Sequence, residues 1–145
     1  MTEPQVIHLV GDGGPNVDWP DFEGAIYLCG PVTGVQDFNC NTFREAKKLL
    51  VAKGYQHIID PVEETERHDE MLDIDRGSAE WHDYMLVAVR KLVECQTIIL
   101  LPGWAESRGA VSELNLAISL KMGVYLLFPT QKLLVQTSRY RMSRH

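Results

Sequence analysis

Four short apolar runs, each followed within two residues by a proline, constrain the fold of this 145-residue chain more than any other feature. They lie at residues 25–29 (AIYLC), 57–60 (HIID), 97–101 (TIILL) and 124–128 (VYLLF). Short apolar runs bounded by turn residues are typical of buried strands, and proline cannot continue a central strand. The sequence therefore predicts four strands, with the most apolar run, 97–101, in the centre of the sheet.

Segments with helical spacing of apolar residues separate these runs. The three predicted helices span residues 41–53, 79–94 and 111–122. Asn41 or Thr42 can cap the first helix, Gly54 lies just past its end, and Ser107 or Gly109 begins the third. Strands that alternate with helices indicate βαβ crossovers. We therefore expect an α/β fold with a mainly parallel sheet of four to five strands and helices on both faces.

The chain divides into a central domain and two flanking segments. Residues 1–24 are interpreted as an N-terminal extension and linker, in which 5–10 are expected to form an edge strand. The domain covers 25–128 and includes a strongly charged loop at 62–78. Residues 129–145 form a basic tail whose first part is compatible with a helix.

Composition excludes several classes of function. A net charge of −6 argues against a surface that follows the phosphates of duplex nucleic acid. No apolar run approaches the roughly 18–20 residues of a membrane span, and the N-terminus lacks a signal-peptide pattern. The three cysteines have no metal-ligand spacing and fit a reducing compartment. We expect a cytoplasmic protein that uses neither a metal nor a cofactor and contacts no membrane.

Three segments that contain candidate binding or catalytic residues follow predicted strands. They are Gly30–Gly34, Asp60-Pro61 and Pro102–Glu113. In open α/β sheets, ligands bind beyond the carboxyl ends of the strands, especially where the strand order reverses. The convergence predicts a pocket at that edge, with Asp60 among its binding residues.

Ser107, Arg108 and Gly109 lie where a helix is expected to start. The first N–H groups of a helix have no partner within the helix, and the helix dipole favours an anion there. A hydroxyl, a guanidinium and a glycine that allows close approach fit a phosphate. A plain N-cap, in which Ser107 serves the helix alone, fits the spacing equally well.

Glu113 lies beside the apolar face of the same predicted helix. A carboxylate aimed at the sheet edge can attack or stabilise a sugar carbon, whereas a surface glutamate near a helix N-terminus is the simpler interpretation. Trp104 follows a strand end and is a candidate pocket wall. The turn at Gly30 and Pro31 either encloses a nucleoside or is purely structural.

These motifs together resemble the nucleoside 2-deoxyribosyltransferase-like superfamily. The segments that carry the resemblance are Ile26–Gly34, Asn41–Phe43, Asp60-Pro61, Trp81 with Tyr84-Met85, and Leu100–Glu113. The chain is most similar to a small branch, common in bacteriophage genomes, that carries the signature LPGWxxSRGAxxE. For a phage-encoded protein, the compartment would be the host cytoplasm.

The resemblance implies a flavodoxin-like (Rossmann-like) three-layer sandwich and chemistry at the N-glycosidic bond of deoxynucleosides or their 5′-monophosphates. It assigns Glu113 as the nucleophile and Ser107 to the 5′-phosphate. It also assigns Gly30 and Pro31 to the nucleoside. Relatives are usually homodimers or higher homo-oligomers in which a neighbouring subunit completes the pocket.

The chain departs from the superfamily pattern at two acidic positions. Where relatives have an aspartate on the helix before the third strand, this chain has Ala88. Where they have a second aspartate, after the cysteine before that strand, it has Gln96. Asp83 cannot replace the first, because five residues along a helix rotate a side chain by about 140°. Protonating a departing base normally requires a second, positioned acid. Asp60, Glu63 or a partner subunit are the alternatives for that role.

Two hypotheses follow for the function. The first is an N-glycosidase or deoxyribosyltransferase that acts on deoxynucleoside 5′-monophosphates through Glu113. The second is a nucleotide-binding protein that uses the same pocket without turnover, with Ala88 marking the loss of catalysis.

Overall fold

The computed structural model describes residues 7–11, 19–22, 24–32, 39–64 and 81–137. The elements in chain order are β1 (Ile7–Gly11), β2 (Ile26–Cys29), α1 (Cys40–Ala52), β3 (Ile58–Ile59), α3 (Trp81–Leu92), β4 (Thr97–Leu100), the 3-10 helix η3 (Trp104–Glu106), α4 (Arg108–Ser119), β5 (Gly123–Phe128) and β6 (Leu133–Thr137). Most of the charged loop predicted at 62–78 lies outside the described residues.

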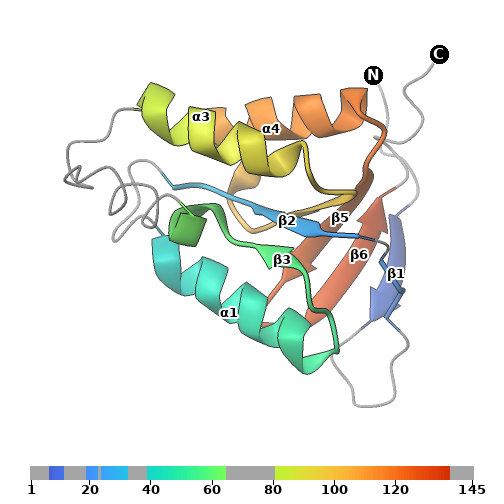
Figure 1. Ribbon diagram of the computed structural model, residues 1–145. Helices are drawn as coiled ribbons and strands as arrows, with labels where there is room; N and C mark the ends of the chain where they lie inside the picture. The colour runs from blue at the N-terminus through green and yellow to red at the C-terminus, as the bar shows by residue number, and fades with distance from the viewer. Residues whose placement is uncertain (1–6, 12–18, 23, 33–38, 65–80, 138–145) are drawn as a thin grey trace.

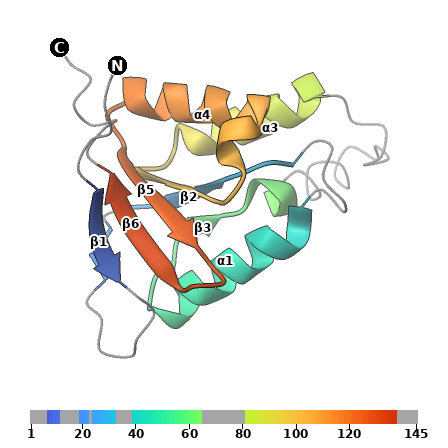
Figure 2. The ribbon, with the colours of Figure 1, turned by 180° about the vertical axis from the view of Figure 1, so that it is seen from behind.

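One six-stranded sheet organises the molecule, in the order β1-β6-β5-β4-β2-β3. The four strands β3, β2, β4 and β5 run parallel, whereas β6 pairs antiparallel with β5 and β1 pairs antiparallel with β6. The fold is therefore α/β with a mixed sheet. The predicted total of four to five strands is too low, because the C-terminal segment adds β6 at the same edge as the expected N-terminal strand β1 (Figure 2).

The start of the C-terminal tail is a strand and not a helix. A turn at residues 129–132, in which the Lys132 N–H donates to the Pro129 carbonyl at 3.2 Å, reverses the chain after β5. The run Leu133–Thr137 then pairs with β5, and Leu134 and Val135 become buried. Pairing with an open sheet edge satisfies the backbone groups and buries the apolar side chains together. The edge strand predicted near the N-terminus is confirmed as β1.

Helices cover both faces of the sheet. Figure 1 shows α1 on one side and α3 with α4 on the other. Alternate residues of β2 enter two separate apolar clusters, with Ile26 and Leu28 on the α1 side and Tyr27 and Cys29 on the α3 and α4 side. Side chains of a strand alternate between faces, so β2 is buried on both.

The ends of α1 agree only partly with the sequence. Asn39, with φ of 62°, occupies the N-cap position without a side-chain cap, so the predicted caps Asn41 and Thr42 are wrong. The Asn39 amide instead donates to the Pro31 carbonyl at 2.9 Å and ties the helix start to the turn after β2. The predicted stop at Gly54 is confirmed by its φ of 103° just past the helix.

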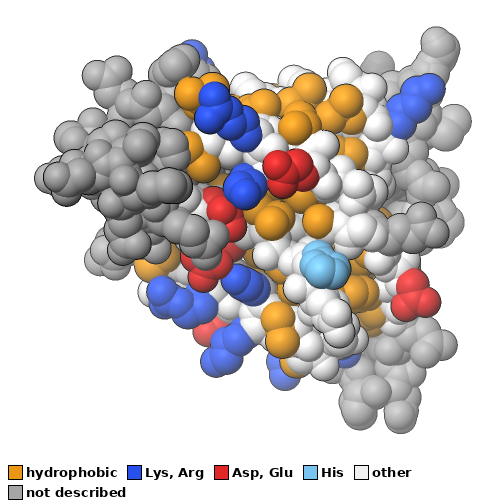
Figure 3. Space-filling view, viewed as in Figure 1, with side chains coloured by type: hydrophobic (Ala, Val, Ile, Leu, Met, Phe, Trp, Pro, Cys, Tyr) orange, Lys and Arg blue, Asp and Glu red, His pale blue; other side chains and the backbone are white. Residues whose placement is uncertain are grey.

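None of the helices that the structure describes has the length and apolar character that a membrane crossing requires. Figure 3 shows Lys and Arg side chains interspersed with Asp and Glu over the described part of one face. On that part of the surface, basic side chains do not gather into a single broad patch.

Candidate functional site

A buried carboxyl group lies between α4 and β2. Glu113 is 2% exposed, and its Oε2 accepts a hydrogen bond of 2.6 Å from the Tyr27 hydroxyl. The Cys29 thiol lies 3.3 Å from the other oxygen, Oε1. Both carboxyl oxygens are therefore engaged by donors from one strand, which fixes the plane of the group.

The local sequence explains why these three groups meet. Tyr27 and Cys29 are two residues apart on β2 and point to the same face of the sheet. On α4, Ala110, Leu114 and Ala117 are buried against that face. Glu113 lies one residue from this apolar stripe and turns inward, so the interpretation of a surface glutamate is wrong.

Burial controls the charge of Glu113. Removal from water raises the pKa of Glu113 to about 7, and the hydrogen bonds from Tyr27 and Cys29 oppose that rise. Near neutral pH the carboxyl group is therefore present in both its protonated and its ionised form. Burial and the adjacent Glu113 carboxyl raise the pKa of Cys29 well above its usual value, so Cys29 remains a neutral thiol.

The start of α4 supplies a second set of polar groups. Ser107 is the N-cap, and its Oγ accepts from the Ala110 N–H at 3.2 Å. The first helical hydrogen bond runs from the Val111 N–H to the Ser107 carbonyl at 2.9 Å. The Gly109 N–H precedes that bond and points along the helix start. The Arg108 side chain is exposed at the first helical position. The predicted N-cap is confirmed, and the Ser107 hydroxyl still has a proton to donate.

Two glycine-proline turns touch each other where β2 and β4 end. Gly103 has φ of 88°, and a Cβ there would lie 3.1 Å from Pro31 Cγ. A Cβ at Gly30 would lie 3.1 Å from the Cβ of Leu101. Trp104 begins η3, next to Gly103, and packs half-buried against the α4 side of the core. The absence of side chains at both glycines permits this close approach.

Asp60 caps the helical turn that follows β3. Its Oδ1 accepts from the N–H groups of Val62 at 2.9 Å and Glu63 at 3.3 Å, and the residue is 7% exposed. Burial raises the pKa of Asp60, while the two backbone hydrogen bonds and Lys47 oppose the rise. Because Ile58 and Ile59 alternate between the two faces, the next residue, Asp60, turns toward α1 and away from the face of Glu113.

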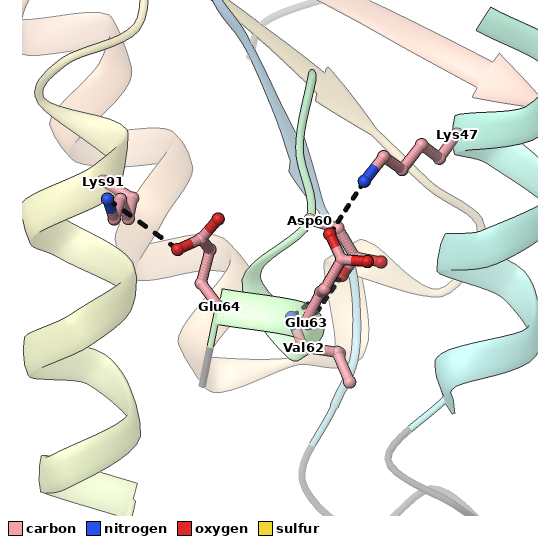
Figure 4. A network of polar contacts seen from close by, with 6 residues as sticks. All are labelled: Lys47, Asp60, Val62, Glu63, Glu64 and Lys91. Carbon is pink, nitrogen blue, oxygen red and sulfur yellow. Dashed lines mark hydrogen bonds and ion pairs between the residues drawn. The ribbon is translucent and has the colours of Figure 1, made fainter. Parts of the chain in front are cut away.

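Two ion pairs hold the same turn between the helical layers (Figure 4). Glu63 pairs with Lys47 of α1 at 2.7 Å, and Glu64 approaches Lys91 of α3 at 3.7 Å. Such partly exposed pairs contribute little stability individually, but their directions orient the turn. Glu63 is thus engaged with α1, at a distance from the α4 side of the sheet.

The two departures from the superfamily pattern differ in position. Ala88 is fully buried in the same apolar cluster as Tyr27 and Cys29. Gln96 lies before β4, at the amino ends of the strands, where its Oε1 accepts from the Ala25 N–H at 2.7 Å. Position 96 is therefore at the opposite edge of the sheet from the start of α4. The Asp83 side chain lies outside the described part of the structure.

The structure brings Glu113 together with two residues that sequence reasoning did not select, Tyr27 and Cys29. A usable signal was the tyrosine within an otherwise apolar buried strand, since a buried phenol normally needs a hydrogen-bond partner. Of the predicted binding residues, Ser107, Arg108 and Gly109 lie at the start of α4. The remaining ones lie at the ends of the preceding strands: Gly30, Pro31, Asp60 and Trp104. Among the residues described, no three histidine, cysteine or acidic side chains are grouped as a metal site would require.

Comparison with protein families gives a match that covers most of the chain. The model of a domain of unknown function, DUF4406, matches residues 24–126, which include β2 through most of β5 and therefore all of the site. The chain belongs to this family. Comparison with curated proteins finds no match.

Proposed function

We propose that this DUF4406 protein cleaves or transfers the N-glycosidic bond of deoxynucleoside 5′-monophosphates, with Glu113 as the nucleophile. The observation that carries the proposal is a buried carboxyl group with both oxygens engaged, on the helix whose N-terminus faces the carboxyl edge of a parallel β-sheet region. A carboxylate held in one plane beside an anion-binding helix start suits attack on a sugar carbon.

The proposed reaction uses these groups as follows. The ionised Glu113 attacks C1′, so that a bond forms between a carboxylate oxygen and C1′ while the C1′–N bond breaks. The electron pair of that bond leaves with the base, which takes up a proton from solvent. Water then hydrolyses the glycosyl ester and restores the carboxylate, or a second base accepts the sugar. The Tyr27 hydroxyl, at 2.6 Å from Oε2, keeps the carboxyl group oriented throughout.

The helix start is the proposed phosphate subsite. Ser107 already uses its lone pair for the Ala110 N–H, so its hydroxyl proton is the part that would reach a phosphate oxygen. The Gly109 N–H and the exposed Arg108 side chain complete the subsite. Gly30, Pro31 and Trp104 would then enclose the nucleoside. Asp60, at the end of β3, would line the same pocket from the α1 side.

The superfamily assignment is part of this proposal. The spatial order of the parallel strands, β3-β2-β4-β5, and helices on both faces support a flavodoxin-like arrangement. The interspersed charges on the face shown in Figure 3 support a small phosphorylated ligand more than duplex nucleic acid. A homo-oligomer and a cytoplasmic location remain predictions.

The experiment that tests the proposal is incubation with a panel of deoxynucleoside 5′-monophosphates, followed by chromatography for free base. Glu113→Ala should abolish base release while nucleotide binding persists. Glu106→Gln, which alters an exposed carboxylate in η3, is the matched control and should retain activity. No base release by the wild type on common and modified deoxynucleotides would refute the enzymatic proposal.

Two variants at Ser107 separate phosphate binding from helix capping. Ser107→Ala removes both the cap and the phosphate donor. Ser107→Asp keeps a capping acceptor but places a negative charge beside the proposed phosphate. We expect Ser107→Asp to fold normally and to lose affinity for the monophosphate while keeping affinity for the unphosphorylated nucleoside. Equal affinity of wild type and Ser107→Asp for the monophosphate would refute the subsite.

A second candidate function is nucleotide binding without turnover. It is favoured by the surroundings of Glu113 within the described residues, where its hydrogen-bond partners are a phenol and a thiol and no second carboxylate joins them. Ala88 fills the superfamily's acidic position with a buried methyl group, and Glu113 itself is 2% exposed. Saturable binding with a thermal shift and intact recovered nucleotide would support this candidate. Base release that depends on Glu113 would exclude it.

A further inference from the structure

The Cys29 thiol lies within reach of two different acceptors. Its Sγ is 3.3 Å from Glu113 Oε1 and 3.4 Å from the carbonyl oxygen of Ala110, in the first turn of α4. A thiol has a single hydrogen, and this hydrogen can rotate about the Cβ–Sγ bond. The thiol can therefore serve one acceptor fully at a time, and the charge on Glu113 determines which of the two is preferred.

Cys29 remains a donor throughout the neutral range. It is fully buried, and burial together with the Glu113 carboxyl raises its pKa well above the usual value. An ionised thiol beside a carboxylate would place two negative charges in an apolar cluster. The relevant change at this contact is therefore the ionisation of Glu113, with Cys29 as its neutral partner.

The geometry points to Cys29 as a positioning residue for Glu113: its thiol hydrogen faces Oε1 while the carboxyl group is ionised and turns to the Ala110 carbonyl once Oε1 is protonated or carries the sugar. The last part of this inference rests on the proposed function. Oε2 is committed to the stronger donor, the Tyr27 hydroxyl at 2.6 Å. Among the described residues, Oε1 has only the weak thiol donor; it therefore keeps more of the negative charge and is the attacking oxygen.

Few other described groups act on the carboxyl. From β2, Tyr27 and Cys29 face it, and both hydrogen bonds lower its pKa against the dominant effect of burial. Lys91 of α3 lies near Glu64, and Arg108 of α4 is exposed at the helix start. The remaining buried side chains of the same cluster on α3, α4 and β4 are uncharged: Ala88, Leu92, Ala110, Leu114, Ala117, Ile98 and Leu100. A change of donor at Cys29 should therefore act directly on the ionisation of Glu113.

Three variants test this inference without any substrate. The readout is the titration of the Glu113 carboxyl carbon by NMR in protein labelled with ¹³C at glutamate side chains, with Glu113→Gln assigning the signal. Cys29→Ser offers a stronger donor and should lower the midpoint, whereas Cys29→Ala removes the donor and should raise it. Each shift should be about one pH unit, a tenfold change in proton affinity. Cys95→Ala removes a buried thiol that donates to the Lys91 carbonyl and should leave the midpoint unchanged.

Opposite shifts in Cys29→Ser and Cys29→Ala support the inference, because a merely structural cysteine would move the midpoint in neither variant or in the same direction in both. Equal midpoints, or shifts of the same sign, overturn it. If Cys29→Ala fails to fold, Cys29→Ser decides alone through the sign of its shift. Opposite shifts without base release from any deoxynucleotide would refute the proposed function and leave the role of Cys29 intact. Base release with unchanged midpoints would support the proposed function and overturn the role of Cys29.

Discussion

Replacing Glu113 by glutamine should make the folded protein more stable above pH 7. The pKa of Glu113 is raised from 4.5 to about 7 in the folded protein, chiefly by burial. The folded state therefore binds this proton more tightly than the unfolded state does. Its contribution to stability is fully present below pH 4.5 and is lost as the pH rises through 7.

The size of the effect follows from the two pKa values. A difference of about 2.5 pH units, at about 1.4 kcal/mol per unit, corresponds to about 3 kcal/mol of stability lost between pH 4.5 and pH 8. Glutamine removes this loss because it does not ionise. Its carbonyl still accepts from Tyr27, but its amide faces the Cys29 thiol, and the poorer contact costs about 1 kcal/mol. We expect Glu113→Gln to be about 2 kcal/mol more stable than the wild type at pH 8 and slightly less stable at pH 5.

Urea unfolding followed by tryptophan fluorescence at several pH values between 5 and 9 measures this difference. Subtracting the two stability curves cancels the titration of all groups that the variant leaves unchanged. Glu106→Gln, which replaces a carboxylate at an exposed position, is the matched control. A flat difference curve for Glu113→Gln, or lower stability than the wild type at pH 8, would refute the raised pKa and the account of the site built on it.

Two further substitutions probe the surroundings of the site. Tyr27→Phe removes the donor to Oε2, so the pKa of Glu113 should rise by about one to two pH units, and the same unfolding series should show its stability loss at correspondingly higher pH. Gly103→Ala should cost about 2 kcal/mol or more, because it combines a φ of 88° with a Cβ 3.1 Å from Pro31 Cγ. Gly54→Ala, with φ of 103° and open space around it, should cost only the backbone strain of about 1 kcal/mol, and equal losses at the two glycines would show that the Pro31 contact is unimportant.

The central part of the fold was predictable because its signals are local. The apolar runs that end at prolines are β2, β3, β4 and β5, and the segments between them contain α1, α3 and α4 close to the predicted positions. Of the two flanking strands, β1 was predicted and β6 was not, because pairing depends on a distant edge. The run Leu133–Thr137 has no strong pattern of its own and becomes a strand through β5, while β1 becomes one through β6.

The candidate site shows the same division between local and distant information. The cap at Ser107 was visible in the sequence, because a cap is determined by neighbours within four residues. The burial of Glu113 was not visible in the sequence. Position 113 lies at the border of the apolar face, where a small rotation of the helix about its axis decides whether the side chain is exposed. Its partners Tyr27 and Cys29 are 86 and 84 residues away, and no spacing rule links them to it.

The site is a set of three polar groups joined by hydrogen bonds inside an apolar cluster. If Glu113 were removed, Tyr27 would lose its acceptor at 2.6 Å and Cys29 would keep the Ala110 carbonyl; Glu113 would bury a poorly compensated carboxyl group if either donor were removed. Substitutions within the set should therefore be strongly non-additive. Tyr27→Phe combined with Glu113→Leu replaces both partners of the 2.6 Å hydrogen bond by apolar groups, so the double variant should lose less stability than the sum of the two single losses. Such coupling is expected for hydrogen-bonded polar groups inside an apolar cluster, where apolar residues would pack the same space at lower cost.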